Sequence, residues 1–347
     1  MQKHLTCFIT LFISLSSIAQ INLDSLWNVW YDNTQADTNR LKAMNKIAWD
    51  GYLYSQPDSA FYFAQLKYDL AESLNNKKSM ALALNTQGLS YCIRGDNTKA
   101  IDYLTKSLKI FKEIENKHGI SYCLNNIGMI YKEQGNYDEA LIYYKNSLKI
   151  NEELGDKKGI STSFLNIGMI YSAQVNNEEA IIYYEKSLKI KKETGDKNDI
   201  VNCLNCIGNI HFKQSNYDKA LNYYKTSLKL YEDLGNKRGI AGSLMNIGNI
   251  YRNQGDLAKA IDYFTKSLKI MKKIGDKNGI ALSLKNIGIT YLDKSNFQKA
   301  QEYLKEALNI SKDINALDLV YDQSKALYGI YKKIGNSKKA LEMYELH

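Results

Sequence analysis

The residues capable of acid–base or metal chemistry are few and widely separated along the chain. Histidine occurs four times, at His4, His118, His211 and His347, and no motif pairs one histidine with another or with a cysteine nucleophile. Metal and acid–base sites need such groups to converge. The sequence therefore gives no basis for a catalytic or metal site, and we expect neither enzyme activity nor a cofactor.

One cysteine pair has a spacing found in redox and zinc proteins. Cys203 and Cys206 form a C-x-x-C motif, which in an oxidising compartment indicates redox activity. However, no second such pair completes a zinc site, and Cys203 shares a recurring position with the small residues Ala83, Cys123 and Ser163. We therefore interpret Cys203 as a small packing residue and expect no disulfide framework.

The net charge of +9 comes from 42 Lys and only 4 Arg. Arginine is the preferred reader of phosphate and guanine, so this imbalance argues against nucleic acid as a partner. Two lysine series recur in register: Lys109, Lys149, Lys189, Lys229 and Lys269, and Lys77, Lys117, Lys157, Lys197, Lys237 and Lys277. We expect the first series on an outward helix face and the second in loops. A solvated surface explains both, and contact with an anionic envelope surface is the alternative.

The Gly-Asp-Lys-Lys-Gly segment at residues 155–159 combines glycine and lysine, as phosphate-binding loops do. It lacks the G-x-x-x-x-G-K-[ST] pattern and a preceding strand. We interpret this segment and its counterparts as connectors between repeated elements.

A repeat with a fixed period of 40 residues organises most of the chain. Small residues recur at this spacing in two series: Gly88, Gly128, Gly168, Gly208, Gly248 and Gly288, and Ala100, Ala140, Ala180, Ala220, Ala260 and Ala300. Such a period is typical of a stacked array of identical units and not of one globule.

The unit at residues 120–159 has the pattern of two helices. Its first half places one face of an α-helix at Leu124, Ile127, Gly128 and Tyr131. Gly135 ends this helix, Asp138 begins the second, and Gly155 ends the second. A lone antiparallel pair cannot bury both faces, which predicts an all-α stack. Glycine inside a helix costs about 1 kcal/mol relative to alanine, so we expect the glycine series to mark close approach of a neighbouring helix backbone.

These residues resemble the tetratricopeptide repeat, whose positions are matched over residues 44–347. The same repeat positions are matched again in a later unit, by Leu244, Ile247, Gly248, Tyr251, Gly255, Ala260, Phe264 and Ser267. The period of 40 differs from the usual 34 and is similar to the kinesin light chain variant, and the proline usual near the end of the second helix is absent. The resemblance implies a right-handed superhelical solenoid whose first helices line a concave, peptide-binding groove.

One series of asparagines falls on the predicted groove: Asn126, Asn166, Asn246 and Asn286. An asparagine amide can pair with both the N–H and the C=O of an extended peptide. The alternative is that these amides bond to their own helix or to water. Neighbouring groove positions, which would supply selectivity, are Met129, Met169, Asn209, Asn249, Lys132 and Arg252.

The chain divides into three parts by sequence. Residues 1–20, with Lys3 and His4 before an apolar run, have the pattern of a secretory signal peptide. Residues 21–43 are predicted to form a capping helix and lead-in, and residues 44–347 an array of about seven units plus a truncated last one. We expect an exported protein on the periplasmic or extracellular side of a bacterial envelope.

Two functions fit this organisation. The first is a non-catalytic scaffold that binds a protein or an extended peptide in the groove. The second is the extracytoplasmic input region of a larger bacterial signalling protein, with a kinase, cyclase or transcription-regulator output beyond residue 347. The second is favoured by the short last unit, because arrays normally end in a polar helix that covers the exposed apolar face.

Overall fold

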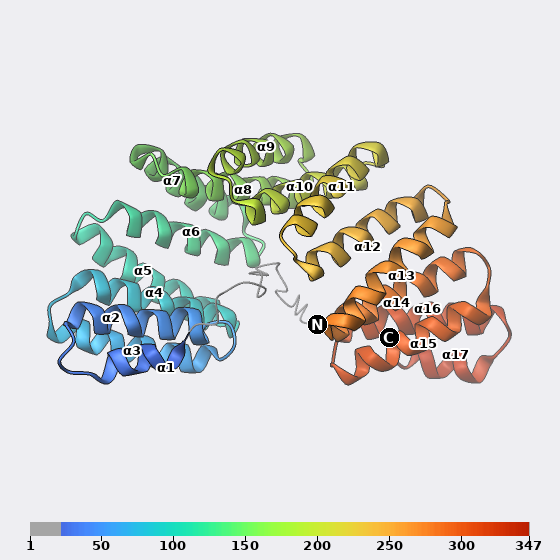
Figure 1. The fold of residues 1–347 in the computed structure, drawn as a ribbon, viewed down its shortest axis with the longest axis horizontal. Coiled ribbons are helices and arrows are strands. Elements are labelled where there is room, and N and C mark those ends of the chain that lie inside the picture. Colours follow the sequence, from blue (N-terminus) through green and yellow to red (C-terminus); the bar gives the residue numbers. More distant parts are fainter. Residues whose placement is uncertain (1–21, 347) are drawn as a thin grey trace. The chain divides into compact units, whose positions relative to one another are not determined.

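The computed structural model describes residues 22–346, which fold into helices joined by short turns, with no strand in this range. The signal peptide predicted for residues 1–20 lies outside the described residues. The chain divides into two compact units, the first ending at Gly195 and the second beginning at Asp196. The expected all-α fold of stacked antiparallel helix pairs is confirmed within each unit (Figure 1).

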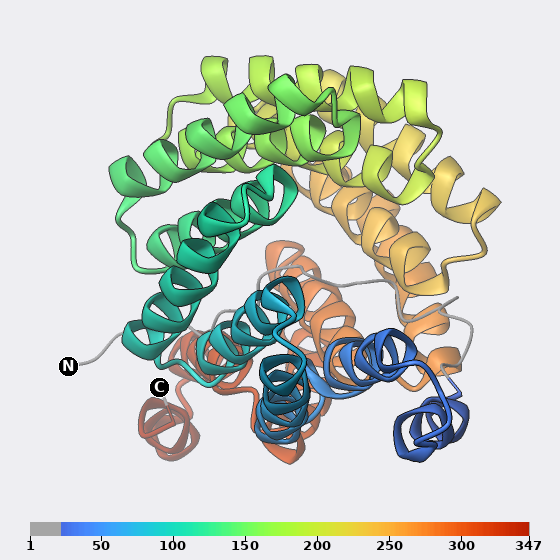
Figure 2. The ribbon, with the colours of Figure 1, turned by 90° about the vertical axis from the view of Figure 1, so that its left-hand side faces the viewer.

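The first unit begins with short helices and continues as helical hairpins. Its elements are α1 (Leu23–Tyr31), α2 (Asp37–Lys46), the π-helix η1 (Ile47–Tyr52), α3 (Pro57–Ser73), α4 (Lys77–Ile93), α5 (Asn97–Glu113), α6 (Lys117–Glu133), α7 (Tyr137–Leu154), α8 (Lys157–Ala173) and α9 (Asn177–Thr194). In both views of the molecule the hairpins of this unit, coloured blue to green, stack one on the next (Figure 1, Figure 2).

The second unit consists of hairpins alone. Its elements are α10 (Lys197–Lys213), α11 (Tyr217–Asp233), α12 (Lys237–Asn253), α13 (Leu257–Ile274), α14 (Lys277–Asp293), α15 (Phe297–Asp313), α16 (Leu317–Lys333) and α17 (Ser337–Tyr344). We call the even-numbered helices from α4 to α16 the first helices and their hairpin partners the second helices. The first-helix face of a unit is the surface that its first helices form together.

Side-chain caps fix where the first helices from α4 to α14 begin. Asn116 accepts a hydrogen bond from the backbone N–H of Gly119 at 2.9 Å, so that α6 starts at Lys117. The same cap recurs at Asn76, Asp156, Asp196, Asn236 and Asp276. The lysine series expected in loops was therefore placed wrongly, since each of these lysines is the first residue of a helix. Lys117 also pairs with Glu153 at the end of the second helix, with an Nζ–Oε2 distance of 2.8 Å.

Each helix glycine of the 40-residue series faces a large side chain of its own hairpin partner. A Cβ atom at Gly208 would lie 2.8 Å from Cε1 of Tyr224, and one at Gly288 would lie 2.8 Å from Cγ of Leu304. A backbone carbonyl is a secondary neighbour, as at Gly88, where the oxygen of Ala100 would be 3.1 Å away. The expected close backbone approach is thus only partly correct, because a ring or leucine fills most of the space.

Two further contacts tie the helices of a hairpin together. Ser147 of α7 donates a hydrogen bond to the backbone carbonyl of Ser121 in α6 at 2.9 Å, and the same bond joins Ser107 to Ala81 and Ser187 to Ser161. Near the turn, tyrosine rings from the two helices stack, as in the Tyr131–Tyr143 pair with centroids 5.4 Å apart. These serine and tyrosine contacts therefore hold the hairpins α4–α5, α6–α7 and α8–α9 closed.

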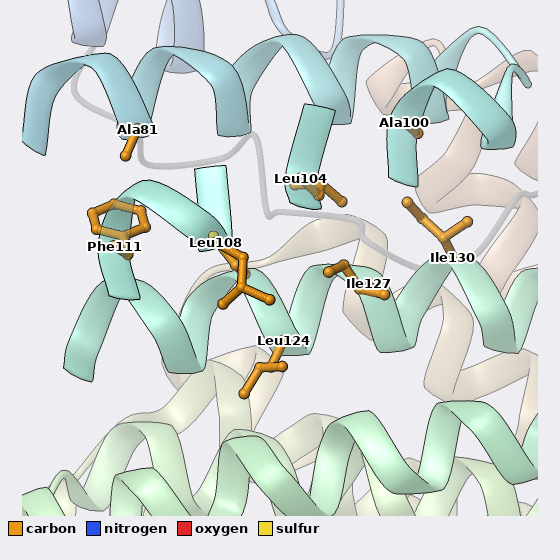
Figure 3. Packing of buried hydrophobic residues seen from close by; sticks show 9 residues of the cluster. Ala81, Ala100, Leu104, Leu108, Phe111, Leu124, Ile127 and Ile130 are labelled. Carbon is orange, nitrogen blue, oxygen red and sulfur yellow. The ribbon is translucent and has the colours of Figure 1, made fainter. Parts of the chain in front are cut away.

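The hydrophobic core lies between successive hairpins. One cluster joins α4, α5 and α6 through the buried side chains of Ala81, Ala100, Leu104, Leu108, Phe111, Cys123, Leu124, Ile127 and Ile130. Figure 3 shows these side chains gathered between the helices. Because α6 covers the hairpin before it, a hairpin inside a unit depends on the next hairpin of the same unit for its burial from water.

The glycine contact gives a matched pair of substitutions within the second unit. Gly208→Ala is expected to lower the free energy of unfolding by about 1–2 kcal/mol, because the added methyl overpacks against the buried Tyr224 ring. Gly242 also lies inside a helix, but a Cβ there would meet nothing within 4 Å. Gly242→Ala is expected to raise the same quantity by up to about 1 kcal/mol. Denaturant unfolding of both variants checks this, and equal effects would contradict it.

Candidate functional site

Asparagine side chains connect neighbouring first helices of the first unit. Nδ2 of Asn126 in α6 donates to Oδ1 of Asn85 in α4 at 3.2 Å. Nδ2 of Asn166 in α8 donates to Oδ1 of Asn125 in α6 at 2.8 Å. Asn85 and Asn126 are 1% and 7% exposed. Two of the predicted groove asparagines thus bond to the preceding first helix, and Asn126 also bonds to Tyr122 of its own helix.

The same spacing of 41 residues recurs in other polar contacts between first helices. The guanidinium Nε of Arg252 in α12 donates to a carboxylate oxygen of Asp293 in α14 at 2.6 Å. Cys92 and Glu133 approach each other with the same separation, with an Sγ–Oε2 distance of 3.7 Å. Position n of one first helix therefore faces position n + 41 of the next.

The remaining predicted groove residues have different surroundings. Oδ1 of Asn209 accepts a hydrogen bond from the Tyr224 hydroxyl of α11 at 2.6 Å. Met129 packs against the buried cluster of Leu53, Ala60 and Leu89. The other members are half-buried on their first helices: Met169, Asn246, Asn249, Asn286 and Lys132. The structure thus distributes these positions between intramolecular contacts and a partly exposed surface.

The segment around η1 contacts the first-helix face of the first unit. The Trp49 ring lies 6.0 Å from that of Tyr122 in α6, and Leu53 packs on Leu89 of α4. Tyr122 keeps 38% of its surface exposed. This segment therefore borders the surface available to a partner near the C-terminal half of α4.

A cavity of about 510 Å³ lies on the first-helix face of the first unit, between α4, α6 and α8. Its wall includes Lys78, Leu82, His118, Tyr122, Asn125, Lys158 and Thr162 from these three helices, and Ser147 and Asn151 from α7. Cationic, amide, hydroxyl and aromatic groups and one carboxylate, that of Asp156, thus meet at one concave place. Such a mixture suits hydrogen bonding and ion pairing with a polar ligand.

Asn125 is the member of this cavity whose role is clearest. Its Oδ1 already accepts the bond from Asn166, which fixes the orientation of the amide. The two N–H groups of the amide are then directed away from Asn166 as donors. Among the described residues they make no hydrogen bond, so Asn125 can donate to a carbonyl or carboxylate oxygen.

The sequence analysis missed Asn85, Asn125, Tyr122 and Lys158. The sequence did hold a usable signal, the Asn125–Asn126 doublet. Asn125 accepts a hydrogen bond from the residue 41 positions later, and Asn126 donates one to the residue 41 positions earlier. The side of the helix on which each amide points depends on the packing angle between hairpins, which a period of 40 does not specify.

Reactive or metal-binding groups do not converge in the described part of the chain. Within residues 22–346 no group of three or more His, Cys, Asp or Glu is placed to hold a metal ion. Burial raises the pKa of the Cys123 thiol, which lies 3.3 Å from the Ser107 hydroxyl and so remains a neutral packing group. None of the helices in this range combines the length and hydrophobicity that crossing a membrane requires.

The profile of the tetratricopeptide repeat matches residues 79–153, 159–233 and 239–313, which is more than half of the chain. The chain therefore belongs to the tetratricopeptide repeat family. The matched segments correspond to the hairpins from α4 to α15. No curated protein sequence matches the chain.

Solved structures show the same fold at low sequence identity. The kinesin light chain-like BtubC (BKLC) from P. vanneervenii has a TM-score of 0.56 and 19% identity, over 62% of this chain and 91% of that one. A signal transduction ATPase with numerous domains and a tetratricopeptide repeat sensor, from Pyrococcus horikoshii, has a TM-score of 0.66 and 19% identity, over 94% and 50%. A Rap protein complexed with competence and sporulation factor has a TM-score of 0.56 and 15% identity, over 89% and 95%.

The asparagine contact between α4 and α6 can be tested by its effect on stability. Asn126→Ala is expected to lower the free energy of unfolding by roughly 1–3 kcal/mol, because the buried carbonyl of Asn85 loses its donor. Asn246 occupies the equivalent position in α12, is half-buried, and makes no side-chain hydrogen bond to any residue that the structure describes. Asn246→Ala is therefore expected to change the same quantity by less than about 0.5 kcal/mol. An equal loss in both variants, measured by urea unfolding, would show that the contact is not the cause.

Proposed function

We propose that this protein is a non-catalytic scaffold that binds an extended peptide or a protein segment on the first-helix face. The observation that carries the proposal is the cavity beside Asn125, where Lys78, Lys158 and the Tyr122 ring come from three successive first helices. A ligand in this place spans several repeats at once, which favours an extended chain over a compact metabolite.

The chemistry of the cavity favours a peptide that carries an acidic or carbonyl-rich stretch. The Asn125 amide donates to backbone or side-chain oxygens, the two lysines provide opposite charge for carboxylates, and the partly exposed Tyr122 ring offers apolar area. Support comes also from the complex of the structurally similar Rap protein with competence and sporulation factor.

A sensor function is the second candidate. It is favoured by the likeness to the ATPase whose tetratricopeptide repeats are described as a sensor, of which this chain spans about half the length. Under this proposal the same first-helix face receives a ligand, and a separate output region responds. Reading the coding sequence after codon 347 distinguishes the candidates, because a membrane helix and an output domain would favour the sensor and a stop codon the free-standing scaffold.

We also propose that the protein is exported, on the basis of the pattern in residues 1–20. A fusion of residues 1–20 to a reporter that is active only outside the cytoplasm tests this directly. Reporter activity should be lost when a charged residue interrupts the apolar run, as in Leu11→Lys. Unchanged activity of the Leu11→Lys fusion would contradict a signal peptide.

The binding proposal can be tested with a random-sequence peptide library selected against the purified protein. Peptides that are enriched should bind the Tyr122→Ala variant about tenfold or more weakly, because a partly exposed aromatic at a central position typically contributes most to affinity. Fluorescence anisotropy with one labelled peptide measures the affinities.

The matched control is Lys149→Ala on the outer side of α7, where the lysine is exposed. This change removes one positive charge away from the first-helix face and is expected to alter the affinity by less than about twofold. The proposal fails if no sequence is enriched, or if the Lys149 and Tyr122 variants lose affinity to the same extent.

A further inference from the structure

A lysine side chain is buried in the first unit without a carboxylate beside it. Lys67 of α3 is 2% exposed, and its Nζ donates a hydrogen bond to Oδ1 of Asn45 in α2 at 2.6 Å. No Asp or Glu of the described residues forms an ion pair with it. Burial disfavours the charged amine and lowers the pKa of Lys67 to about 7.

A cavity of about 650 Å³ adjoins Lys67 and is bounded by α1, α2, α3 and the start of α4. Its charged members are all positive: Lys42 and Lys46 from α2, Lys67 from α3 and Lys78 from α4. The described lining residues include no Asp or Glu. Its apolar members come from α1, α2 and α4: Leu26, Val29, Leu41, Ala43 and Leu82.

Electrostatics and shape together indicate what such a cavity holds. A buried ammonium without a counter-charge is costly, and the cost is offset when an anion enters and pairs with it. Lysines around the opening add a positive potential that attracts anions. The apolar wall excludes water from that pair and requires a ligand with a nonpolar part.

We propose that the cavity between α1, α2, α3 and α4 binds a small organic carboxylate. Its anionic group pairs with Nζ of Lys67, and its apolar part packs against Leu26, Val29 and Leu82. The proposal rests on Lys67, which lines this cavity and not the one beside Asn125. Lys78 and Leu82 border both cavities, so neither residue serves as a test variant.

Binding should respond to pH in a defined direction. The pKa of Lys67 is about 7 in the unliganded protein, so its amine is mostly neutral above this pH. A carboxylate that pairs with the ammonium form then binds together with the uptake of one proton by Lys67. The affinity therefore falls as the pH rises above 7. The other titratable groups that face the cavity are Lys42 and Lys46 on α2 and Lys78 on α4, while α1 contributes only Leu26 and Val29.

The lowered pKa of Lys67 can be checked first without a ligand. In the unfolded chain the lysine keeps its ordinary pKa of 10.5 and holds a proton that the folded protein has released above pH 7. Stability therefore rises with pH across this window. The Tm of the wild-type protein should increase from pH 7 to pH 9 relative to Lys67→Met, which lacks the amine. Parallel Tm profiles would mean that Lys67 is already charge-paired, and the proposal would fall.

Sodium octanoate is a suitable probe, because it has one carboxylate and an unbranched apolar chain. Isothermal titration calorimetry at pH 7 should show saturable binding to the wild-type protein, with 1-octanol and inorganic phosphate each bound about tenfold or more weakly. Titrations in two buffers of different ionisation enthalpy should reveal proton uptake above pH 7. Equal binding of octanol would reduce the site to an apolar cavity, and equal binding of phosphate to an unspecific anion site, so that either result overturns the proposal.

Two variants locate the carboxylate at Lys67. Lys67→Met removes the cation, and Asn45→Asp places a tethered carboxylate next to Nζ, so both should weaken octanoate binding about tenfold or more. Lys149→Met on the exposed side of α7, outside the cavity lining, is the control and should weaken it by less than about threefold. Far-ultraviolet circular dichroism of the same samples establishes that the variants are folded. Undiminished binding of octanoate to folded Lys67→Met or Asn45→Asp, or no saturable binding to the wild type, would disprove the site.

Discussion

The contact between a helix glycine and a large residue of the partner helix is the constraint on which this structure depends. It allows the ring of Tyr144, Tyr184, Tyr224 or Phe264 to lie directly against the first helix. The hairpin then closes tightly enough for the serine and tyrosine contacts to form. Within each unit, the outer surface of a closed hairpin is the surface that the next hairpin buries, so tight closure of one hairpin also prepares the stacking of the next.

The first-helix face serves both assembly and recognition. Asn126, Asn166 and Arg252 join neighbouring first helices through hydrogen bonds. The sequence analysis had assigned these same side chains to peptide binding. Asn125, Tyr122 and Lys158 remain at the edge of a cavity. A polar residue at a predicted groove position is therefore not a binding residue until its intramolecular partner is known.

The N-terminal part of the chain departs from the repeat, and the departure has a chemical consequence. In place of a regular first helix, α2 continues into the π-helix η1, and α1 lies beside them. In this arrangement a cavity bounded by α1, α2, α3 and the start of α4 lies next to Lys67. The sequence analysis treated residues 21–43 as a cap and did not find Lys67, because one lysine among 42 carries no signal of burial.

The sequence by itself determined the repeat, the helix pairs, the glycines at which helices stop and the family, because glycine and alanine act locally and recur every 40 residues. It also indicated that chemistry-bearing histidines and cysteines do not cluster. Only the tertiary structure decided that Asn126 bonds to Asn85 and not to a partner, that Tyr224 fills the space at Gly208, and that Lys67 is buried. These outcomes depend on the angle and offset between helices, which arise from many side chains packing together and are not encoded at any single position.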